Sequence, residues 1–446
     1  MANGTTNTYP STGLFDIARL ICGLVFGRVR HPRSFSPGRV IAHWIWGVTR
    51  RRGSENIVVN LGIRKLLLVT GKDLSKHILD QTPNSKSYIA GPSKIGGMSF
   101  LAPQALTISQ DDQWGRLRPM NDQVLSIDDD PELQRMVLEQ VHSAFAQPVS
   151  STDDIRDRMG RVMLGVVFGG APGHLVEDIN VLIGVVQNPL RNIMAARRQR
   201  GRLDKFYTTI QQMWEKNEQP QGHNLLAKAC PLTQGEEFAG DNLSQQVPHW
   251  MFTFTGSGTD LLTRTLAMLV SRPNVVDSVR EEISAAGPLD EPGTIGRLPF
   301  LEASIMETCR LFPPVFRTMH VAPDGDTFEG VAIRPGMEIW HYFPVNYRDT
   351  SADPLANHFE PQKWIDSGDE RRQAYPNFFL SGARACPGED LIIFICKAAI
   401  AILLGQDRAR PGSSALASDP LPFMFPNGAV KFYTGKHGQP HDVLAE

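Results

Sequence analysis

The 446-residue sequence has few cysteines, almost no net charge and no long uncharged apolar run. Its five cysteines are odd in number, and no two of them stand at C-x-x-C spacing. This pattern argues against a disulfide framework, a zinc knuckle and an iron–sulfur cluster, and it favours a reducing, cytoplasmic compartment. The formal net charge of −2 argues against a nucleic-acid-binding protein, because such proteins usually carry a strong basic excess.

No stretch of about 18 apolar residues is free of charge, so no transmembrane span is predicted. The N-terminal segment, residues 1–50, nevertheless contains an apolar run from Leu14 to Phe26, interrupted by Asp16 and Arg19. Its apolar residues recur at helical spacing. Two interpretations remain open: an amphipathic helix that lies on a membrane surface as a peripheral anchor, or a helix that docks on the body of the protein.

Residues 51–446 show no repeat, no low-complexity linker and no domain boundary, which predicts a single domain. Its expected fold class is mainly α with a minor β region. Hydrophobic periodicity and turn residues predict two strands around Gly62 within 56–70, followed by a mostly helical stretch to about 310. This stretch contains a long buried helix over 245–270. Strands and turns are expected within 311–345, an irregular stretch over 346–385 and an apolar helix over 391–404.

One cysteine lies in a sequence context that favours metal binding. The segment from Phe379 to Glu389 is FLSGARACPGE, in which an irregular stretch with Gly382 leads to Cys386 and a helix then begins. Pro387 suits the first turn of that helix. A sulfur held just before a helix faces unpaired backbone N–H groups and the positive end of the helix dipole, and both favour the thiolate. A thiolate is the form that binds iron, and it donates electron density to the metal.

The same segment resembles the haem-binding signature of the cytochrome P450 family, F-x-x-G-x-R-x-C-x-G. Every fixed position is matched, at Phe379, Gly382, Arg384, Cys386 and Gly388. The resemblance implies the cytochrome P450-type fold, haem b (iron protoporphyrin IX) as cofactor, and Cys386 as the axial ligand of the haem iron.

A second motif lies upstream, where Glu307 and Arg310 form an E-x-x-R pair followed by the run LFPP. This resembles the family's E-x-x-R helix, in which the pair is structural and locks the region near the cysteine loop. Its usual third partner is an arginine in an F-x-P-x-R motif. This chain has Lys363 at that position, and lysine cannot make the bidentate fork of arginine, so a looser triad is expected.

Haem carries two propionates that need cationic or hydrogen-bonding partners. The resemblance assigns this role to Trp114 and Arg118, which match the family's W-x-x-x-R, and also to His320 and Arg384. His320 has an alternative role as a strand histidine bonded to backbone. Arg317 falls where the family's chain passes beside the haem, so it is a candidate to bind an acidic substrate, with a turn to solvent or to a propionate as the alternative.

The long apolar helix contains the run GSG, which predicts a kink or a π-bulge. It resembles the family's oxygen-side motif [AG]-G-x-[DE]-T, with Gly256 and Thr259 at the glycine and the threonine. The resemblance implies that Thr259 is the catalytic hydrogen-bonding residue for dioxygen or peroxide, the alternative being a threonine bonded back to its own helix. The acid position holds Gly258, and Asp260 lies about 100° further around the helix. Water, peroxide chemistry or a rearrangement without a proton relay would each account for the missing acid.

The resemblance implies a haem-thiolate monooxygenase that inserts one atom of dioxygen into a small, hydrophobic organic substrate. The chain has no flavin or nicotinamide fingerprint, so electrons are expected from a separate ferredoxin, flavodoxin or flavoprotein reductase, unless peroxide replaces them. Two alternatives stay open: peroxygenase, rearrangement or reduction chemistry at the same haem, and a non-catalytic haem-thiolate binder or sensor. A basic docking face for an acidic donor is predicted on the cysteine side, from Arg116, Lys363, Arg371, Arg372 and Lys397.

Overall fold

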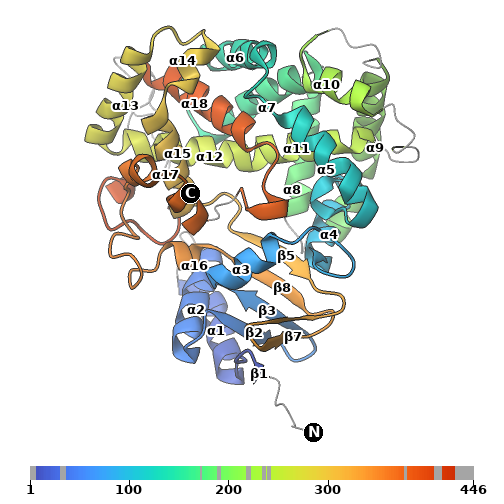
Figure 1. The fold of residues 1–446 in the computed structure, drawn as a ribbon, viewed down its shortest axis with the longest axis vertical. Helices are drawn as coiled ribbons and strands as arrows, with labels where there is room; N and C mark the ends of the chain where they lie inside the picture. Colours follow the sequence, from blue (N-terminus) through green and yellow to red (C-terminus); the bar gives the residue numbers. More distant parts are fainter. Residues whose placement is uncertain are drawn as a thin grey trace.

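The computed structural model describes residues 7–30, 37–170, 173–187, 192–216, 222–233, 238, 243–375, 379–405 and 414–426. Most of its helices gather in one layer, and a small sheet flanked by the N-terminal helices forms a second layer (Figure 1). Helices dominate the described chain, which confirms the predicted class, mainly α with a minor β region.

The larger sheet has five strands in the order β2-β3-β8-β5-β4. Strands β2 (Asn56–Asn60) and β3 (Lys65–Val69) pair antiparallel around the predicted turn. β3 pairs parallel with β8 (Glu338–Tyr342), which pairs antiparallel with β5 (Arg317–Val321), and β4 (Ile89–Ala90) forms the far edge. A smaller sheet in the order β1-β7-β6 holds β1 (Asn7–Thr8), β6 (Asp326–Phe328) and β7 (Val331–Ile333). The strands predicted within 56–70 and 311–345 are thus confirmed.

Side chains of β3 alternate between the two faces of the larger sheet, as the strand period requires. Leu66 and Leu68 share an apolar cluster with Ile45 of α2 (Pro37–Arg52). Leu67 joins a separate cluster with Leu74 of α3 (Lys72–Leu79). The sheet is therefore covered on both faces, which holds β5 and β8 firmly beneath the helical layer.

The long helix predicted over 245–270 is present as α11 (Gln246–Thr253), a π-helix (Phe254–Gly258) and α12 (Thr259–Val270). The π turn lies at the run GSG, where glycine lowers helix propensity, and it confirms the predicted weak point. The helix predicted over 391–404 is α18 (Glu389–Gly405), and every residue from Leu391 to Leu404 is buried. It packs against α6 (Pro131–Phe145), α12, α13 (Pro273–Ala286) and α15 (Pro299–Leu311).

The remaining helices of the helical layer and its connections are α4 (Pro92–Met98), α5 (Asp111–Leu125), α7 (Thr152–Phe168), α8 (His174–Gln187), α9 (Asn192–Lys216), α10 (Leu225–Leu232), α14 (Pro292–Gly296) and α16 (Pro344–Tyr347).

The prediction of an irregular stretch over 346–385 is wrong in part, because α17 (Gln362–Ala374) forms there with a break at Gly368. The sequence of α17 is rich in charged residues and has no apolar stripe, so periodicity could not reveal it. Trp364 and Arg371 are buried, and both donate hydrogen bonds to Glu307 of α15. Tertiary bonds to a buried carboxylate, rather than an apolar face, hold this helix in place.

The N-terminal helix α1 (Leu14–Arg30) packs against α2 around a buried carboxylate. Asp16 is 3% exposed and forms an ion pair with Arg51 at 3.0 Å. Ile17 packs against the cluster between α2 and the sheet, whereas Leu14 is 91% and Val25 54% exposed. Docking on the body of the protein therefore accounts for only part of the apolar run. No helix in the described ranges combines the length and the apolar character needed to span a membrane.

Candidate active site

The loop before α18 is shaped by the fixed residues of the predicted signature. The backbone N–H of Cys386 donates to the carbonyl of the buried Phe379 at 2.7 Å. Gly382 has a φ of +59°, and a Cβ there would lie 2.4 Å from Oδ1 of Asp80, so conformation and space both require glycine. At Gly388 a Cβ would lie 3.5 Å from the ring of Phe254, which places the start of α18 against the π-helix. The two motifs that the sequence singled out are thus neighbours in space.

The side chain of Cys386 is exposed, yet burial by the surrounding protein raises the pKa of its thiol to about 11. The N–H of Gly388 and the charge of Arg118 act toward the thiolate, in the predicted direction, but burial outweighs them. The predicted effect of the helix N-terminus is therefore present, but in the chain alone it is smaller than the effect of burial. A bound metal cation is what makes a thiolate the stable form.

The π-helix and the start of α12, called the distal helix below, contain a glycine that borders open space and a threonine with an unpaired hydroxyl. A Cβ added to Gly256 would meet no atom within 4 Å, so this glycine faces open space. Thr259 is fully buried, and its Oγ1 has no hydrogen-bond partner in the described chain. Thr255, one turn earlier, instead donates from Oγ1 to the carbonyl of Met251 at 2.6 Å. Thr259 is not bonded back to its own helix, so its hydroxyl is available to another group.

The position of the missing acid is crowded by apolar side chains. A Cβ added to Gly258 would lie 2.8 Å from Cδ1 of Ile392 on α18 and 3.7 Å from Cε of Met159 on α7. A carboxylate there would meet apolar atoms and lose its hydration, which is costly. Asp260 cannot take its place, because it pairs with Arg264 at 2.9 Å. The described structure therefore supplies no carboxylate at the acid position.

Two of the predicted propionate partners come together at the edge between α4 and the sheet. Arg384 donates from Nη2 to the carbonyl of Tyr88 at 2.6 Å, and its Nε has no partner among the described residues. His320 on β5 is buried, and its Nδ1 is likewise unpaired, which rules against a backbone bond at that atom. Burial, assisted by the charge of Arg384, holds the pKa of His320 well below its usual range, so the imidazole is neutral.

The other two predicted propionate partners lie on α5. Arg118 donates from Nη1 to the carbonyl of Ala385 at 2.6 Å and of Ala383 at 3.2 Å, so it grips the cysteine loop directly. Its Nε donates to Asp122 at 2.8 Å. Trp114 lies one turn earlier and packs, partly buried, against the main apolar cluster. The W-x-x-x-R face is thus aimed at the loop that carries Cys386.

Arg317 lies at the start of β5 and is exposed. Its guanidinium stacks over the rings of Phe316, at 5.5 Å, and Trp340, at 5.0 Å. Partial burial lowers its pKa from the ordinary value, but it remains charged. The aromatic contacts fix the side chain between two rings without pairing its charge to a carboxylate.

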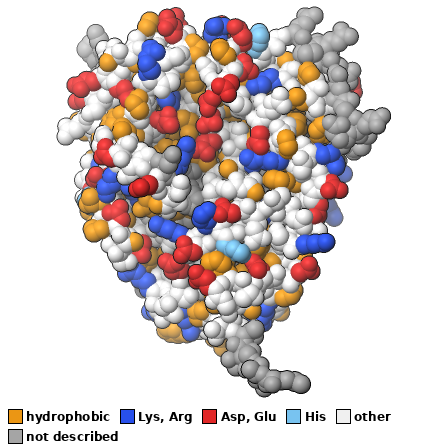
Figure 2. All heavy atoms as spheres, in the orientation of Figure 1, with side chains coloured by type: hydrophobic (Ala, Val, Ile, Leu, Met, Phe, Trp, Pro, Cys, Tyr) orange, Lys and Arg blue, Asp and Glu red, His pale blue; other side chains and the backbone are white. Residues whose placement is uncertain are grey.

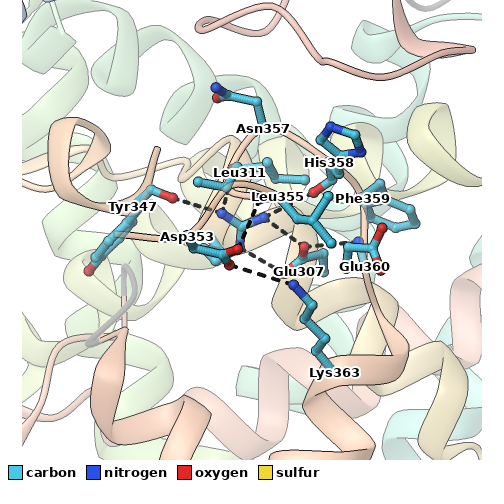
Figure 3. A network of polar contacts seen from close by, with 12 residues as sticks. Glu307, Leu311, Tyr347, Asp353, Leu355, Asn357, His358, Phe359, Glu360 and Lys363 are labelled. Atoms are coloured by element: carbon cyan, nitrogen blue, oxygen red, sulfur yellow. Dashed lines mark hydrogen bonds and ion pairs between the residues drawn. The ribbon is translucent and has the colours of Figure 1, made fainter. Parts of the chain in front are cut away.

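The E-x-x-R pair forms a buried network that ties three segments together (Figure 3). Arg310 donates to both carboxylate oxygens of Glu307, at 2.7 and 2.9 Å. It also donates to the backbone carbonyls of Tyr347, at the end of α16, and of Ala356 and His358 in the chain that follows. Burial alone would raise the pKa of Glu307, but the charges of Arg310 and Arg371 outweigh it and lower the pKa to about 2. The pair thus joins α15 to α16 and to the chain that follows α16.

The third partner of this network is not the predicted one. Lys363 points to Asp353, with 3.6 Å between Nζ and Oδ2, and makes no bond to Glu307 (Figure 3). Arg371, eight residues further along α17, takes that place with its Nη2 3.1 Å from Glu307 Oε2. The expectation of a looser triad built on Lys363 is therefore wrong. Arg371 completes the triad, and it lies in the part of α17 that follows the break at Gly368.

The basic residues of the predicted docking face are not free, solvent-exposed charges. Arg371 and Lys397 are buried, and Lys397 is paired with Glu302 at 3.0 Å. Arg372 pairs with Glu389 at 2.6 Å. Figure 2 shows acidic and basic side chains interspersed over the face it presents. Electrostatic attraction from these residues is therefore weaker than the sequence suggested.

Comparison with known proteins decides the family. A family model described as Cytochrome P450 matches residues 99–425, which is most of the chain. The chain belongs to the cytochrome P450 family. Haem b is the cofactor of that family, so the cofactor predicted from the cysteine loop is confirmed.

Curated cytochrome P450 enzymes are similar to this one at low identity. Berbamunine synthase of Berberis stolonifera is 24% identical over 59% of this chain and 54% of its own length. The cytochrome P450 monooxygenase acrF of Aspergillus aculeatus is 26% identical over 60% of this chain and 64% of its own length. Flavonoid 3'-monooxygenase of Arabidopsis thaliana is 27% identical over 39% of this chain and 36% of its own length. The chain thus matches between about a third and two thirds of these relatives.

The residues of this cytochrome P450 fit haem b. The thiol of Cys386 is accessible, Gly256 borders open space, and Thr259 has a hydroxyl without a partner among the described residues. Nδ1 of His320 and Nε of Arg384 have no partner among the described residues, as expected if a propionate binds to them. Sequence reasoning missed two further basic side chains, Lys94 on α4 and His249 on α11, because neither lies in a motif.

Proposed function

We propose that this cytochrome P450 is a monooxygenase that inserts one atom of dioxygen into a small, hydrophobic organic substrate, with Cys386 as the axial iron ligand. The observation that carries the proposal is the unpaired hydroxyl of the buried Thr259 beside the gap at Gly256, on the helix next to the cysteine loop. A hydroxyl that is desolvated and unpaired costs free energy, so a bound group is expected to satisfy it.

The side chains of the site divide the work between holding the cofactor and handling a proton. Haem b supplies the redox chemistry of dioxygen when it is bound. Cys386 provides the thiolate, and the unpaired nitrogens of His320 and Arg384 hold one propionate. Arg118 and Trp114, on the face of α5 turned toward the cysteine loop, hold the other. Each propionate gains charge-assisted or neutral hydrogen bonds in a water-poor setting.

On the oxygen side, Thr259 holds a proton at Oγ1 and donates a hydrogen bond into the space that Gly256 leaves open. Its position is fixed because Thr259 follows the π turn directly. The apolar atoms of Ile392 and Met159 around Gly258 exclude a charged partner on that side. Protons therefore reach Thr259 through water rather than through a side-chain carboxylate.

Electrons come from a separate donor, a ferredoxin, a flavodoxin or a flavoprotein reductase. A second candidate function, peroxygenase chemistry, is favoured by one observation, the closed and apolar acid position at Gly258. Peroxide already carries the electrons and protons that an acid–threonine relay helps to deliver. A chain without the relay would therefore be less impaired with peroxide than with dioxygen.

The test compares turnover of the same substrate under two conditions. Substrates are first found by the spin-state shift of the ferric haem on binding. The proposal expects product with dioxygen and a surrogate reductase, and at most slow product with hydrogen peroxide alone. Product formed only with peroxide would establish the peroxygenase and refute the monooxygenase. A protein that binds gases tightly, shows no spin-state shift with any organic ligand and turns over none would instead be a sensor.

The exposed apolar side of α1 supports peripheral membrane association of this enzyme. Large apolar side chains are exposed along the helix, at Leu14, Phe15, Ile21, Val25, Phe26 and Val29. Exposed apolar patches mark interaction sites, and Arg19 and Arg28 on the same helix suit anionic lipid. Cosedimentation with vesicles of anionic phospholipid tests this. Val25→Asp should reduce the bound fraction several-fold, and equal binding of the variant would exclude a role for α1.

A further inference from the structure

One side of α11 and of the distal helix that follows it is partly exposed, whereas the other sides are buried. Six residues that recur every three or four positions are partly exposed, and the residues between them are buried; the six are His249, Phe252, Thr253, Gly256, Ser257 and Asp260. Residues at this spacing lie on one face of a helix. These six residues are called the exposed stripe below.

The exposed stripe faces the segment around α4 rather than the rest of the helical layer. α11, the π-helix and α12 pack against α7, α8, α15 and α18, which cover the other sides. Phe252 of the stripe instead packs against an apolar cluster of Met98, at the end of α4, with Ala102 and Ala105. A Cβ added to Gly256 would meet no atom within 4 Å. The stripe therefore borders free space one turn beyond its contact with the α4 segment.

Most polar side chains of the exposed stripe already have partners within the protein. Thr253 donates from Oγ1 to the carbonyl of His249 at 3.1 Å, and Ser257 donates from Oγ to the carbonyl of Thr253 at 2.8 Å. Asp260 pairs with Arg264 at 2.9 Å. Neither ring nitrogen of His249 has a hydrogen-bond partner among the described residues. His249 is therefore the polar side chain of the stripe that is left to bind a ligand.

The two ring nitrogens of His249 have different surroundings. Nδ1 is buried without a partner, and a buried N–H without a partner is costlier than a buried lone pair. The proton of the neutral ring therefore resides on Nε2. Since the side chain is partly exposed although Nδ1 is not, Nε2 is the nitrogen that can reach the free space. Burial also lowers the pKa of His249 to about 4, which agrees with a neutral ring that donates from Nε2.

We propose that His249 recognises the substrate by donating a hydrogen bond from Nε2 to an acceptor oxygen, such as a carbonyl, that is remote from the oxidised carbon. The inference rests on the monooxygenase proposed above, because it narrows the substrate class of that site. His249 precedes Gly256 by seven residues, which corresponds to about 10 Å along a helix. Phe252 lies between them on the stripe, so an apolar part of the substrate joins the acceptor oxygen to the oxidised carbon.

The experiment is a spectral titration of the purified ferric holoenzyme with 1-alkylimidazoles, whose imidazole nitrogen binds the haem iron. Each compound that ends in a methyl ketone is compared with the alkyl compound of the same length, and the length is varied. The wild type should bind the ketones about three- to tenfold more tightly, as expected of one neutral hydrogen bond. This preference should be greatest where the extended chain spans about 10 Å. His249→Phe and His249→Leu, which remove the donor, should abolish the preference, and His249→Gln, which keeps an N–H donor, should retain part of it.

The matched control is Thr253→Val, one turn from His249 on the same stripe, because the hydroxyl of Thr253 is already bonded to the helix. It should keep the preference for ketones. A wild type without that preference at any chain length, or an unchanged preference in His249→Phe and His249→Leu, would overturn the proposal. Loss of the preference in Thr253→Val as well would assign it to the shape of the space and would also overturn the proposal. Failure of the monooxygenase is separately visible, because it is measured by turnover and this titration reads binding alone.

Discussion

Replacing Arg371 by glutamine should destabilise the protein much more than the same replacement of Lys363. Arg371 Nη2 lies 3.1 Å from Oε2 of Glu307, which is completely buried, and the guanidinium stacks over Trp364 at 5.2 Å and Tyr375 at 5.3 Å. Lys363 is paired only with Asp353, at 3.6 Å and partly in water. The two residues differ in what they contact although both are basic residues of one helix.

The size of the difference follows from these contacts. A hydrogen bond to a charged group contributes about 1.5–3 kcal/mol, and each cation–π contact at least about 0.5–1 kcal/mol. Because one hydrogen bond and two cation–π contacts are lost, Arg371→Gln should cost about 2.5–5 kcal/mol of unfolding free energy. Lys363→Gln should cost about 0–1 kcal/mol, as expected for an exposed ion pair. Glu307→Gln should cost about 3–5 kcal/mol, because it leaves Arg310 and Arg371 without their buried partner.

The assay is denaturant unfolding of the holoprotein, followed by far-ultraviolet circular dichroism. A double-mutant cycle between Glu307 and Arg371 isolates their coupling, which should exceed about 1 kcal/mol for residues in one network. Equal effects of Arg371→Gln and Lys363→Gln would refute the reasoning. So would a coupling energy near zero in the cycle.

The same network predicts a pH dependence. The pKa of Glu307 in the folded protein is about 2, below the ordinary value of 4.5. A carboxyl group whose pKa is lowered by folding stabilises the fold fully when the pH is above its unfolded pKa. This contribution is lost as the pH falls through the pKa of the folded protein. The stability advantage of the wild type over Glu307→Gln should therefore shrink between pH 4.5 and 2. An advantage that stays constant over this range would contradict the ion network.

Two pairs of substitutions test the distal helix. Gly256→Ala should stabilise the protein by up to about 1 kcal/mol through helix propensity, since its Cβ meets nothing, whereas Gly258→Ala should gain nothing, because its Cβ would lie 2.8 Å from Ile392. The midpoints of denaturant unfolding check this prediction, and equal midpoints for Gly256→Ala and Gly258→Ala would contradict it. Thr259→Ala should release several-fold more peroxide per electron pair than the wild type, whereas Thr263→Ala, one turn away and also unpaired at Oγ1, should not. Equal peroxide release from both variants would remove the catalytic role of Thr259.

Local features of the fold and site could be predicted from the sequence. The hairpin around Gly62, the helix that weakens at the run GSG, and α18 each depend on residues adjacent in the chain. The cysteine loop is local in the same way, since Phe379 and Cys386 bond across seven residues. In each case the pattern and its structural cause lie within one segment, so the sequence carries the information directly.

The errors concern contacts between distant segments. Arg371 is 64 residues from Glu307, and only the packing of α17 on α15 brings them together. Motif spacing pointed to Lys363 instead, which the fold turns toward Asp353. For Cys386, the sequence indicated the local effect of Gly388 but not the burial that outweighs it and raises the pKa to about 11.

The most direct test of the central claim is the absorption spectrum of the reduced enzyme with carbon monoxide. Thiolate ligation by Cys386 predicts a Soret band shifted strongly to the red in freshly purified protein, because the thiolate donates electron density to the iron. Cys386→Ser should lose that shift while Cys396→Ser, a buried cysteine on α18, retains it. A wild-type enzyme that folds and binds haem but lacks the red shift, or a Cys386→Ser variant that keeps it, would contradict the assignment.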